Sequence, residues 1–448
     1  MDLALLGFLT IGSFLFLILF ARVPVVVALI LVPIAAALLG GFDTEIAAMS
    51  IDGLKTVAPI ATMMMFAVLY FGLMIDVGLF DPLVRGLTGL VRSDPVRLCL
   101  VTAALPMLVA LDGDGATTFL ISITALLPVH RQLGIDRLVL PTIVGLSAGV
   151  MNMLPWGGPT ARAMTVLDAG VADIFVPVLP SMAAGLAWVF FVAWWLGRRE
   201  RVRLAAAGPG RATGEGVVPW AGIAEEFEET PLVQQPKWLF RFNLGLTLLL
   251  VLLLFRDLFA GILPLPPLPA PLLFMLAFAI ALPVNRRTLE AQQAQLASHA
   301  PNVVLVLSMV LAAGVFTGIL GGTGMIAAMA RTLAGAVPPM AAPWLGEIVA
   351  LTGMPLSLVF TPDAYYFGIL PVFAETAAAL GHDPHAIGRA AILGQMTTGF
   401  PLSPLTASTY ILIGLSGVTL REHQRSLFGW AFGTTLVMAA VAIATGAI

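Results

Sequence analysis

Apolar stretches of about the length that crosses a bilayer recur along almost the whole chain. A membrane-spanning helix needs about 20 mostly apolar residues. The stretches that meet this requirement are 3–20, 23–42, 59–80, 137–172, 175–197, 238–260, 264–284, 302–321, 387–416 and 426–447. This pattern predicts an all-α polytopic membrane protein.

Two further apolar stretches, 98–128 and 338–373, are interrupted in the middle by polar residues, Gly or Pro. Irregular backbone at membrane depth is tolerated only where it is buried in protein or lines a water-filled cavity. We therefore expect each stretch to form a re-entrant hairpin, which enters the membrane and returns to the same side. Pro and Gly also interrupt 137–172 and 387–416, and we expect these two segments to be broken helices.

A polar segment, 198–237, separates two hydrophobic halves, 1–197 and 238–448. It contains GRRERVR, GPGRATGEG and AEEFEETP, which is typical of a linker. Each half contains an interrupted stretch, Leu-Pro, a polar turn with Leu-Gly-x-Asp, a small-residue helix and a Pro/Gly-rich break with Thr. This similarity predicts two inverted repeats of about five spans each, and broken helices at matching places indicate a transporter binding site.

Positive charges give the expected orientation. An odd number of spans in each half inverts the second half and places both termini on the side opposite the linker. Most of the 22 Lys and Arg residues then fall on the linker side. The exceptions are Lys55, Arg256, Arg331 and Arg389 on the other side and Arg162 inside a span. The positive-inside rule therefore predicts a cytoplasmic linker and two outside termini in the cytoplasmic membrane.

Composition agrees with a chain embedded in membrane lipid. It is 59% hydrophobic and 10% charged, whereas soluble domains carry about 25% charged residues. The net charge of −3, without a basic tail, predicts no nucleic-acid partner. A single cysteine, Cys99, excludes an intrachain disulfide, and no soluble catalytic domain is evident. The N-terminus lacks a basic region and a cleavage motif, so we expect the first span to be retained.

Two acidic residues interrupt the apolar stretch LVALDGDGATTFLISITALLP, residues 108–128. A charge at bilayer depth costs at least about 2.5–3.5 kcal/mol on insertion scales and usually has a function. Gly113 lets the backbone turn at the tip of a hairpin and expose its amides. Asp112 and Asp114 are therefore candidate ligand-binding residues, and two close carboxylates also make a proton site plausible. The alternative is that one of them caps the helix that follows.

A single basic residue, Arg162, lies inside a predicted span, in MLPWGGPTARAM. The run that contains Gly157 and Gly158 between two prolines cannot continue a helix, so a new half-helix should begin near Thr160. Its free amides attract an anion, and the guanidinium can bind a carboxylate through two hydrogen bonds. The alternative is an intramembrane salt bridge. Its candidate partners are Asp112, Asp114 and Asp168. A substrate could replace such a partner.

The second half offers Asp363 in VFTPDAYYFGILP, where it either caps a helix or binds a ligand or a proton. The second helix break, TTGFPLSPLTAS, carries hydroxyl groups but no charge. Ser403, Thr406 and Ser408 could hold substrate oxygens or a cation, or they could satisfy the backbone around the two prolines. Thr117 has the same two interpretations.

Other polar residues carry less weight. Asp76 and Asp81 fall at the cytoplasmic end of a span, where an interfacial position is expected. We expect all histidines to lie in loops, which predicts neither a histidine metal site nor a histidine proton relay. These residues are His130, His299, His382, His385 and His423.

Several motifs resemble the citrate–metal–proton symporter family, CitMHS. They are LDGDGATTF, MLPWGGPTARAM, TPDAYYFGILPV and GFPLSPLTASTY, together with the N-terminal ALILVPIAAALLGGF and LYFGLMIDVGLFDPL. The resemblance covers nearly the whole chain and is weak only in 198–237. The family belongs to the ion transporter superfamily. The resemblance therefore implies an elevator-type transporter fold and a homodimer, with a scaffold domain and a moving transport domain.

Divalent anion/sodium symporters of that superfamily carry Ser-Asn-Thr at their hairpin tips, which binds sodium and a substrate carboxylate. The corresponding tips here read Asp112-Gly113-Asp114 and Thr361-Pro362-Asp363. The resemblance implies that protons or a divalent metal replace sodium, with Asp112, Asp114 and Asp363 as metal-binding and proton-coupling residues. No separate cofactor is expected, because the metal enters as part of the substrate.

The chemistry of the residues agrees with a metal–citrate substrate. Free citrate is a multivalent anion that several acids would repel, whereas carboxylates suit Mg²⁺ or Ca²⁺ and Arg162 suits the carboxylates of citrate. The nearest alternative is a proton-coupled carrier of another small di- or tricarboxylate without metal. An intramembrane Asp-x-Asp enzyme and a channel are rival classes, and the repeated halves argue against the enzyme.

Overall fold

The computed structural model describes residues 2–82, 94–113, 115–207, 236–255, 268–338 and 340–448. Within these ranges every regular element is a helix. Much of the predicted linker, 208–235, lies outside the described residues.

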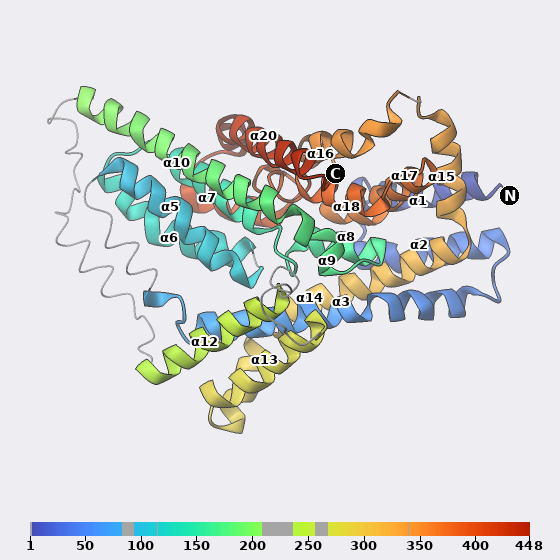
Figure 1. Ribbon diagram of the computed structural model, residues 1–448, viewed down its shortest axis with the longest axis horizontal. Coiled ribbons are helices and arrows are strands. Elements are labelled where there is room, and N and C mark those ends of the chain that lie inside the picture. Colours follow the sequence, from blue (N-terminus) through green and yellow to red (C-terminus); the bar gives the residue numbers. More distant parts are fainter. Residues whose placement is uncertain (1, 83–93, 114, 208–235, 256–267, 339) are drawn as a thin grey trace.

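In the first half, α1, α2 and α3 are followed by the helix pair α5–α6, the interrupted helix α7–α8 and the long helix α10 (Figure 1). The elements are α1 (Leu3–Leu19), α2 (Val25–Gly40), α3 (Ile46–Asp76), α5 (Pro95–Val109), η1 (Ala110–Asp112), α6 (Gly115–Gln132), α7 (Val139–Met151), α8 (Gly158–Leu167), α9 (Val171–Ile174), η2 (Val176–Val178) and α10 (Leu179–Ala207).

In the second half, the helix pair α16–α17 again precedes an interrupted helix, α18–α19, and a long helix, α20. The elements are α12 (Lys237–Leu254), α13 (Ala270–Asn285), α14 (Leu289–Gly322), α15 (Met325–Ala336), η4 (Ala342–Trp344), α16 (Leu345–Leu356), the π-helix η5 (Ala364–Ile369), α17 (Leu370–Ala379), α18 (Pro384–Ile392), η6 (Phe400–Leu402), α19 (Ala407–Ser416) and α20 (Leu420–Ala444).

Helix ends differ from the hydropathy boundaries because polar residues continue several helices. The clearest case is α10, which runs ten residues into the predicted linker and ends at Ala207. Charged residues are good helix formers, and Arg201 also donates to Asp94, the N-cap of α5, at 2.7 Å. Although burial raises it, hydrogen bonds from Arg201 and the Val96 amide hold the pKa of Asp94 below its ordinary value.

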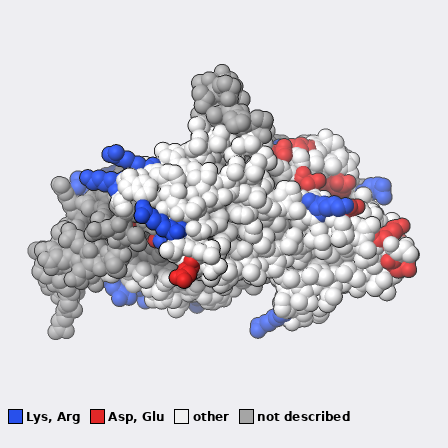
Figure 2. Space-filling view, turned by 90° about the horizontal axis from the view of Figure 1, so that it is seen from below, with Lys and Arg blue, Asp and Glu red and all other residues white. Residues whose placement is uncertain are grey.

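The length and composition of the helices are those of a multi-pass membrane protein. Five helical segments within the described ranges are long and apolar enough to cross a membrane. They are Ile46–Asp76, Val171–Ala206, Lys237–Leu254, Leu289–Gly322 and Leu420–Ala444. Leu39 and Phe20 expose 75% and 74% of their surface, as expected where lipid is the solvent. On the face shown in Figure 2, charged side chains gather toward the two ends and leave the middle largely uncharged.

The helices form two packed groups (Figure 1). In one group α3 lies along α14, with α2 and α13 beside them. In the other, α5, α7, α10 and α20 pack together and α16 packs against α18 and α20. The end of α10 lies at the opposite end of the molecule from the N-terminus. Helix α8 contacts α3 and α14 of the first group and α18 of the second, so it lies where the two groups meet.

Glycines allow α3 and α14 to cross at backbone contact. A Cβ atom on Gly53 would lie 2.0 Å from the carbonyl oxygen of Gly314 and 2.9 Å from the Cα atom of Gly318. Small residues at a crossing let transmembrane helices approach closely, because packing rather than the hydrophobic effect drives their association in lipid. Tertiary packing therefore requires a glycine at position 53.

We predict that Gly53→Ala destabilises the protein, because the added methyl group meets backbone that cannot rotate away. Overpacking of this kind costs about 1–3 kcal/mol. The expected result is a lower midpoint of thermal unfolding in detergent, followed by tryptophan fluorescence. Gly321→Ala on α14 is the matched control, because a Cβ atom there meets nothing within 4 Å. Equal midpoints for the two variants would contradict the prediction.

Candidate functional site

Two helix-pair tips and two helix breaks converge between the halves of the chain. The tips are 110–115, between α5 and α6, and 357–363, between α16 and the π-helix. The breaks are 152–157, between α7 and α8, and 393–406, between α18 and α19. Hydrogen bonds and close packing connect these four segments.

The first tip is attached to the first break by Trp156. Its indole Nε1 donates to the carbonyl oxygen of Leu111 at 2.8 Å, and its ring stacks on Phe71 of α3 with centroids 4.9 Å apart. Gly113 turns the tip with φ of +79°, and a Cβ atom there would lie 3.4 Å from Trp156. The tip therefore rests on a fixed aromatic surface.

The two breaks meet each other directly. Asn152 Nδ2 donates to the carbonyl oxygen of Met396 at 2.7 Å. Met396 adopts a left-handed conformation, with φ of +59°. A Cβ atom on Gly149 would lie 2.6 Å from the carbonyl oxygen of Thr397. The interrupted helices of the two halves thus satisfy and touch each other's backbone.

The first helix pair also packs on the second break. A Cβ atom on Gly115 would lie 2.3 Å from the ring of Phe400. The rings of Phe119 and Phe400 stack with centroids 5.5 Å apart and an interplanar angle of 20°. The start of α6 is therefore positioned by an aromatic residue from the opposite half of the chain.

An ion pair joins the second tip to the first half-helix. Arg162 Nε donates to Asp363 Oδ1 at 2.7 Å, and Arg162 Nη1 donates to the carbonyl oxygen of Gly158 at 3.0 Å. The two charged side chains are 21% and 13% exposed. The pair is thus largely enclosed but still partly exposed.

The salt-bridge partners expected for Arg162 differ from the observed one. The structure pairs Arg162 with Asp363, which the sequence did not suggest because 201 residues separate them. Asp168 instead ends α8 in a left-handed conformation, with φ of +49°, and is exposed. Asp114 lies outside the described residues, and for Asp112 only the backbone is described.

Thr361 caps the second tip, and Asp363 does not. The hydroxyl of Thr361 accepts a hydrogen bond from the amide of Ala364 at 3.2 Å. Asp363 occupies the N-cap position of the π-helix but makes no capping bond with its side chain. Its carboxylate is directed to Arg162 instead, so the capping alternative does not account for this residue.

A glutamine in the second break was missed by sequence reasoning. Gln395 is fully buried, its carbonyl oxygen accepts from the Tyr366 hydroxyl at 2.9 Å, and its side-chain oxygen accepts from the Ser357 hydroxyl. Its side-chain nitrogen has no hydrogen-bond partner among the described residues. Buried polar groups are nearly always paired, so this donor is a candidate ligand contact. The signal in the sequence was an amide within the predicted broken helix.

Two of the remaining candidate hydroxyls form hydrogen bonds with the backbone. Thr160 donates to the carbonyl oxygen of Met153 at 2.6 Å, and Ser403 accepts from the amide of Leu405 at 3.2 Å. Both hydroxyls therefore stabilise the breaks. The remaining residues are Thr117 in the first turn of α6, Gly157 at the N-cap of α8, Gly158 at its first residue, Thr406 at the N-cap of α19 and Ser408 in its first turn. The hydroxyl of Thr406 is buried without a hydrogen-bond partner among the described residues.

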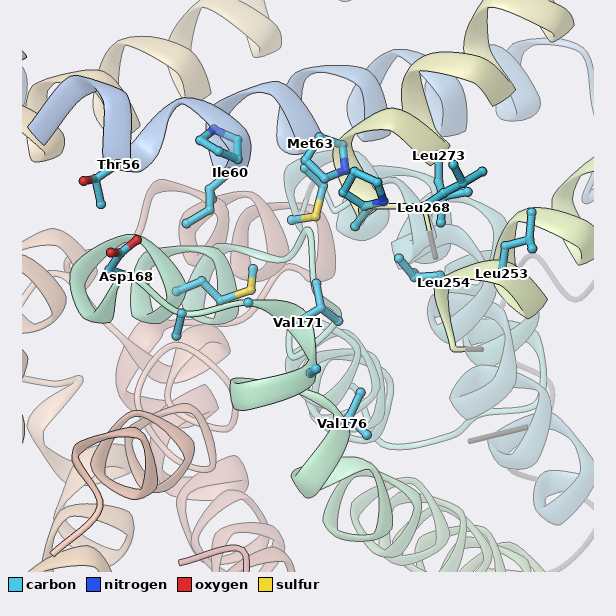
Figure 3. A pocket seen from close by; sticks show the side chains of 18 residues that line it. Thr56, Ile60, Met63, Asp168, Val171, Val176, Leu253, Leu254, Leu268 and Leu273 are labelled. Carbon is cyan, nitrogen blue, oxygen red and sulfur yellow. The ribbon is translucent and has the colours of Figure 1, made fainter. Parts of the chain in front are cut away.

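A cavity with mostly apolar walls lies away from these four segments. It has a volume of about 410 Å³ and is bounded by α3, the segment after α8, and residues 253–254 and 268–273 (Figure 3). Aliphatic side chains such as Ile60 and Leu273 dominate its walls, and Asp168 is the charged residue among the described lining. Such walls do not suit a polycarboxylate.

The expected placement of the histidines is wrong for most of them. His130 lies in α6, His299 in α14, His385 in α18 and His423 in α20. These helices extend past the hydropathy windows, so residues assigned to loops lie on packed helices. Among the described residues, no group of three or more His, Cys, Asp or Glu side chains could hold a metal ion. Asp114 and the side chain of Asp112 lie outside the described part of the chain.

We predict that Trp156→Phe weakens the attachment of the first tip. Phenylalanine keeps the contact with Phe71 but loses the hydrogen bond to Leu111, and a hydrogen bond of this kind contributes about 0.5–1.5 kcal/mol. The midpoint of thermal unfolding in detergent should fall. Trp344→Phe, at a residue whose surface is 59% exposed, should leave it unchanged. A Trp156→Phe midpoint equal to that of the unsubstituted protein would contradict this assignment.

Comparisons with known proteins agree with a transporter. The family model CitMHS, described as citrate transporter, matches residues 15–394. A citrate transporter of Bacillus subtilis (strain 168) is 44% identical over 448 residues, which cover 100% of this chain and 99% of the relative. A Mg(2+)/citrate complex secondary transporter of the same organism is 43% identical over 450 residues, with 100% and 99% covered.

A solved structure supports the fold. The chain is similar to the YdaH transporter of Alcanivorax borkumensis, with a TM-score of 0.55 and 16% sequence identity, and the match covers 100% of this chain and 99% of that one. At this identity the likeness concerns the fold alone. The curated relatives and the family are transporters rather than enzymes. The family match and the full-length relatives show that this multi-pass membrane protein belongs to the citrate transporter family, CitMHS.

Proposed function

We propose that this protein is a secondary active transporter that carries citrate complexed with a divalent metal ion, together with protons, across the cytoplasmic membrane. The observation that supports it best is the Arg162–Asp363 ion pair. It places a cation and an anion from opposite halves of the chain beside both a tip and a break. A metal–citrate complex also presents an anionic and a cationic face.

Arg162 is suited to the citrate side of the complex. Its guanidinium stands one turn into α8, whose first amides and dipole favour an anion, and it can bind a carboxylate through two hydrogen bonds. The buried amide of Gln395 adds an uncharged donor in the opposite break. A citrate carboxylate would take the place that Asp363 holds beside Arg162.

Acidic residues are suited to the metal side. Once citrate occupies Arg162, the carboxylate of Asp363 is released to face the metal, with Asp112 and Asp114 from the first tip. Mg²⁺ and Ca²⁺ both prefer carboxylate oxygens. A relative named for the Mg(2+)/citrate complex supports this substrate class. One or more of these three acids would carry the coupling proton.

Transport requires the site to open alternately to the two sides. We assign residues 1–197 and 238–448 to two inverted repeats, because each half carries a helix pair, an interrupted helix and a long helix in the same order. The group that holds α5, α7, α10, α16, α18 and α20 would move as the transport domain of an elevator, against a scaffold built on α3 and α14. A homodimer with outside termini and a cytoplasmic linker completes this proposal.

We predict that Arg162→Lys and Asp363→Asn each reduce uptake of labelled citrate by proteoliposomes. Hydrogen bonds to charged groups contribute about 1.5–3 kcal/mol, which corresponds to a loss of roughly tenfold or more. Lysine keeps the charge but not the planar guanidinium. Asp52→Asn is the matched control, because Asp52 pairs with Lys55 on the exposed surface. Wild-type uptake by both site variants would contradict the assignment.

Metal dependence tests the substrate itself. We predict that uptake of labelled citrate requires Mg²⁺ or Ca²⁺ and stops when a chelator removes divalent ions, with rates measured across a metal series with and without a pH gradient. Asp112→Asn combined with Asp114→Asn should abolish the metal-dependent uptake. Uptake that neither metal removal nor the double substitution changes would overturn the metal–citrate proposal and favour a metal-free carboxylate carrier.

A further inference from the structure

Asp76 and His299 form a polar contact that the transport proposal does not use. His299 Nε2 and Asp76 Oδ2 lie 2.7 Å apart, and the same oxygen accepts from Gln295 Nε2 at 2.5 Å. Asp76 is the last residue of α3, whereas His299 and Gln295 lie on α14. The side chains of His299 and Asp76 are 18% and 35% exposed. The contact therefore joins two long helices at a partly enclosed position.

The carboxylate of Asp76 is held in a defined orientation. Arg286 Nε donates to Gln295 Oε1 at 2.9 Å, which leaves the amide nitrogen of Gln295 to donate to Asp76. An ionised carboxylate only accepts hydrogen bonds, so the proton on Nε2 of His299 faces Asp76. The other ring nitrogen, Nδ1, is then the basic one.

A glycine makes room for the imidazole. A Cβ atom on Gly72 would lie 2.5 Å from Cε1 and 2.7 Å from Nδ1 of His299. Gly72 precedes Asp76 by four residues, so the two share one face of α3. The ring thus lies against the helix backbone at Gly72, and its Nε2 is hydrogen-bonded to the carboxylate of Asp76. Both α3 residues belong to the motif LYFGLMIDVGLFDPL, to which the proposed function assigns no role.

A small cavity connects this histidine to the first tip. It has a volume of about 110 Å³, and its lining includes Gly72, His299, Asn302 and Gly113. A water molecule occupies about 30 Å³ of liquid, so the cavity has room for water beside polar groups. Gly113 stands between Asp112 and Asp114 in the sequence. The imidazole therefore shares a cavity with the tip that carries the two acids.

We propose that His299 is a proton-binding site of the transport cycle, in which Nδ1 binds a proton that comes from the solvent through water in this cavity while Nε2 donates to Asp76. The charged groups described around it are Asp76 on α3 and Arg286, which acts through Gln295. This inference rests on the proposed proton-coupled transport. A proton on His299 would add a positive charge beside the cavity that reaches Gly113 of the first tip.

The test uses the full-length protein in proteoliposomes with His299→Gln. Glutamine can still donate to Asp76 but binds no proton at neutral pH. Two assays are compared: exchange of labelled Mg²⁺–citrate at equal pH and concentration on both sides, and accumulation driven by a pH gradient. We expect exchange to stay within about twofold of wild type, whereas accumulation falls about tenfold or more and the pH profile of the uptake rate flattens.

Two further variants make the test specific. His382→Gln removes an exposed histidine from the turn before α18 and should change neither assay. Asp76→Asn keeps the imidazole but removes its counter-charge, so the midpoint of the pH profile should move to lower pH without disappearing. Thermal unfolding in detergent shows whether each variant is folded. If His299→Gln does not fold, the Asp76→Asn profile decides, and an unshifted midpoint overturns the proposal.

The outcomes separate this inference from the function on which it rests. Wild-type accumulation and pH dependence in His299→Gln would overturn the role of His299 and leave the proposed function intact. Loss of both exchange and accumulation in folded His299→Gln would show a structural role and also overturn it. Wild-type protein that exchanges Mg²⁺–citrate but does not accumulate it under a pH gradient would instead overturn proton coupling itself.

Discussion

A helix that breaks inside an apolar surrounding must have its freed backbone groups satisfied by other parts of the protein. The two interrupted helices meet this constraint largely through each other and their neighbours. Asn152 of the first break binds the backbone of Met396 in the second, and Tyr366 and His423 bind the carbonyl oxygens of Gln395 and Pro401. Neither break satisfies all of its backbone groups by itself, so the site forms only when both halves of the chain are folded together.

The groups that remain after this backbone satisfaction are the ones with chemistry to offer. Thr160 and Ser403 are used to stabilise the breaks, whereas Arg162 and Asp363 face each other across the two halves at 2.7 Å. An enclosed ion pair is costly to break unless a ligand replaces both partners. A substrate with an anionic and a cationic face can do so, which is why this pair supports a metal–citrate complex better than a free anion.

The α3–α14 pair performs a different task from the group that holds the breaks. Its glycine crossing at Gly53 and Gly314 brings backbones into contact, which gives a rigid wall. The wall carries Asp76 and His299 where it meets the cavity of the first tip. The proton proposed for His299 would therefore bind at the side of the α3–α14 pair that faces the first tip.

The local sequence alone determined the helices, the helix breaks and the family of this protein. Hydropathy gave the helices, Pro and Gly gave the breaks, and the motifs gave the family, because the transfer free energy of a segment and the conformational limits of those residues are local properties. The partner of Arg162, the role of Gln395 and the placement of His299 were decided by tertiary structure. These contacts join residues 201 and 223 positions apart, as in Arg162–Asp363 and Asp76–His299. Only packing of the two halves decides which polar groups meet at that separation, since each alone is compatible with several partners.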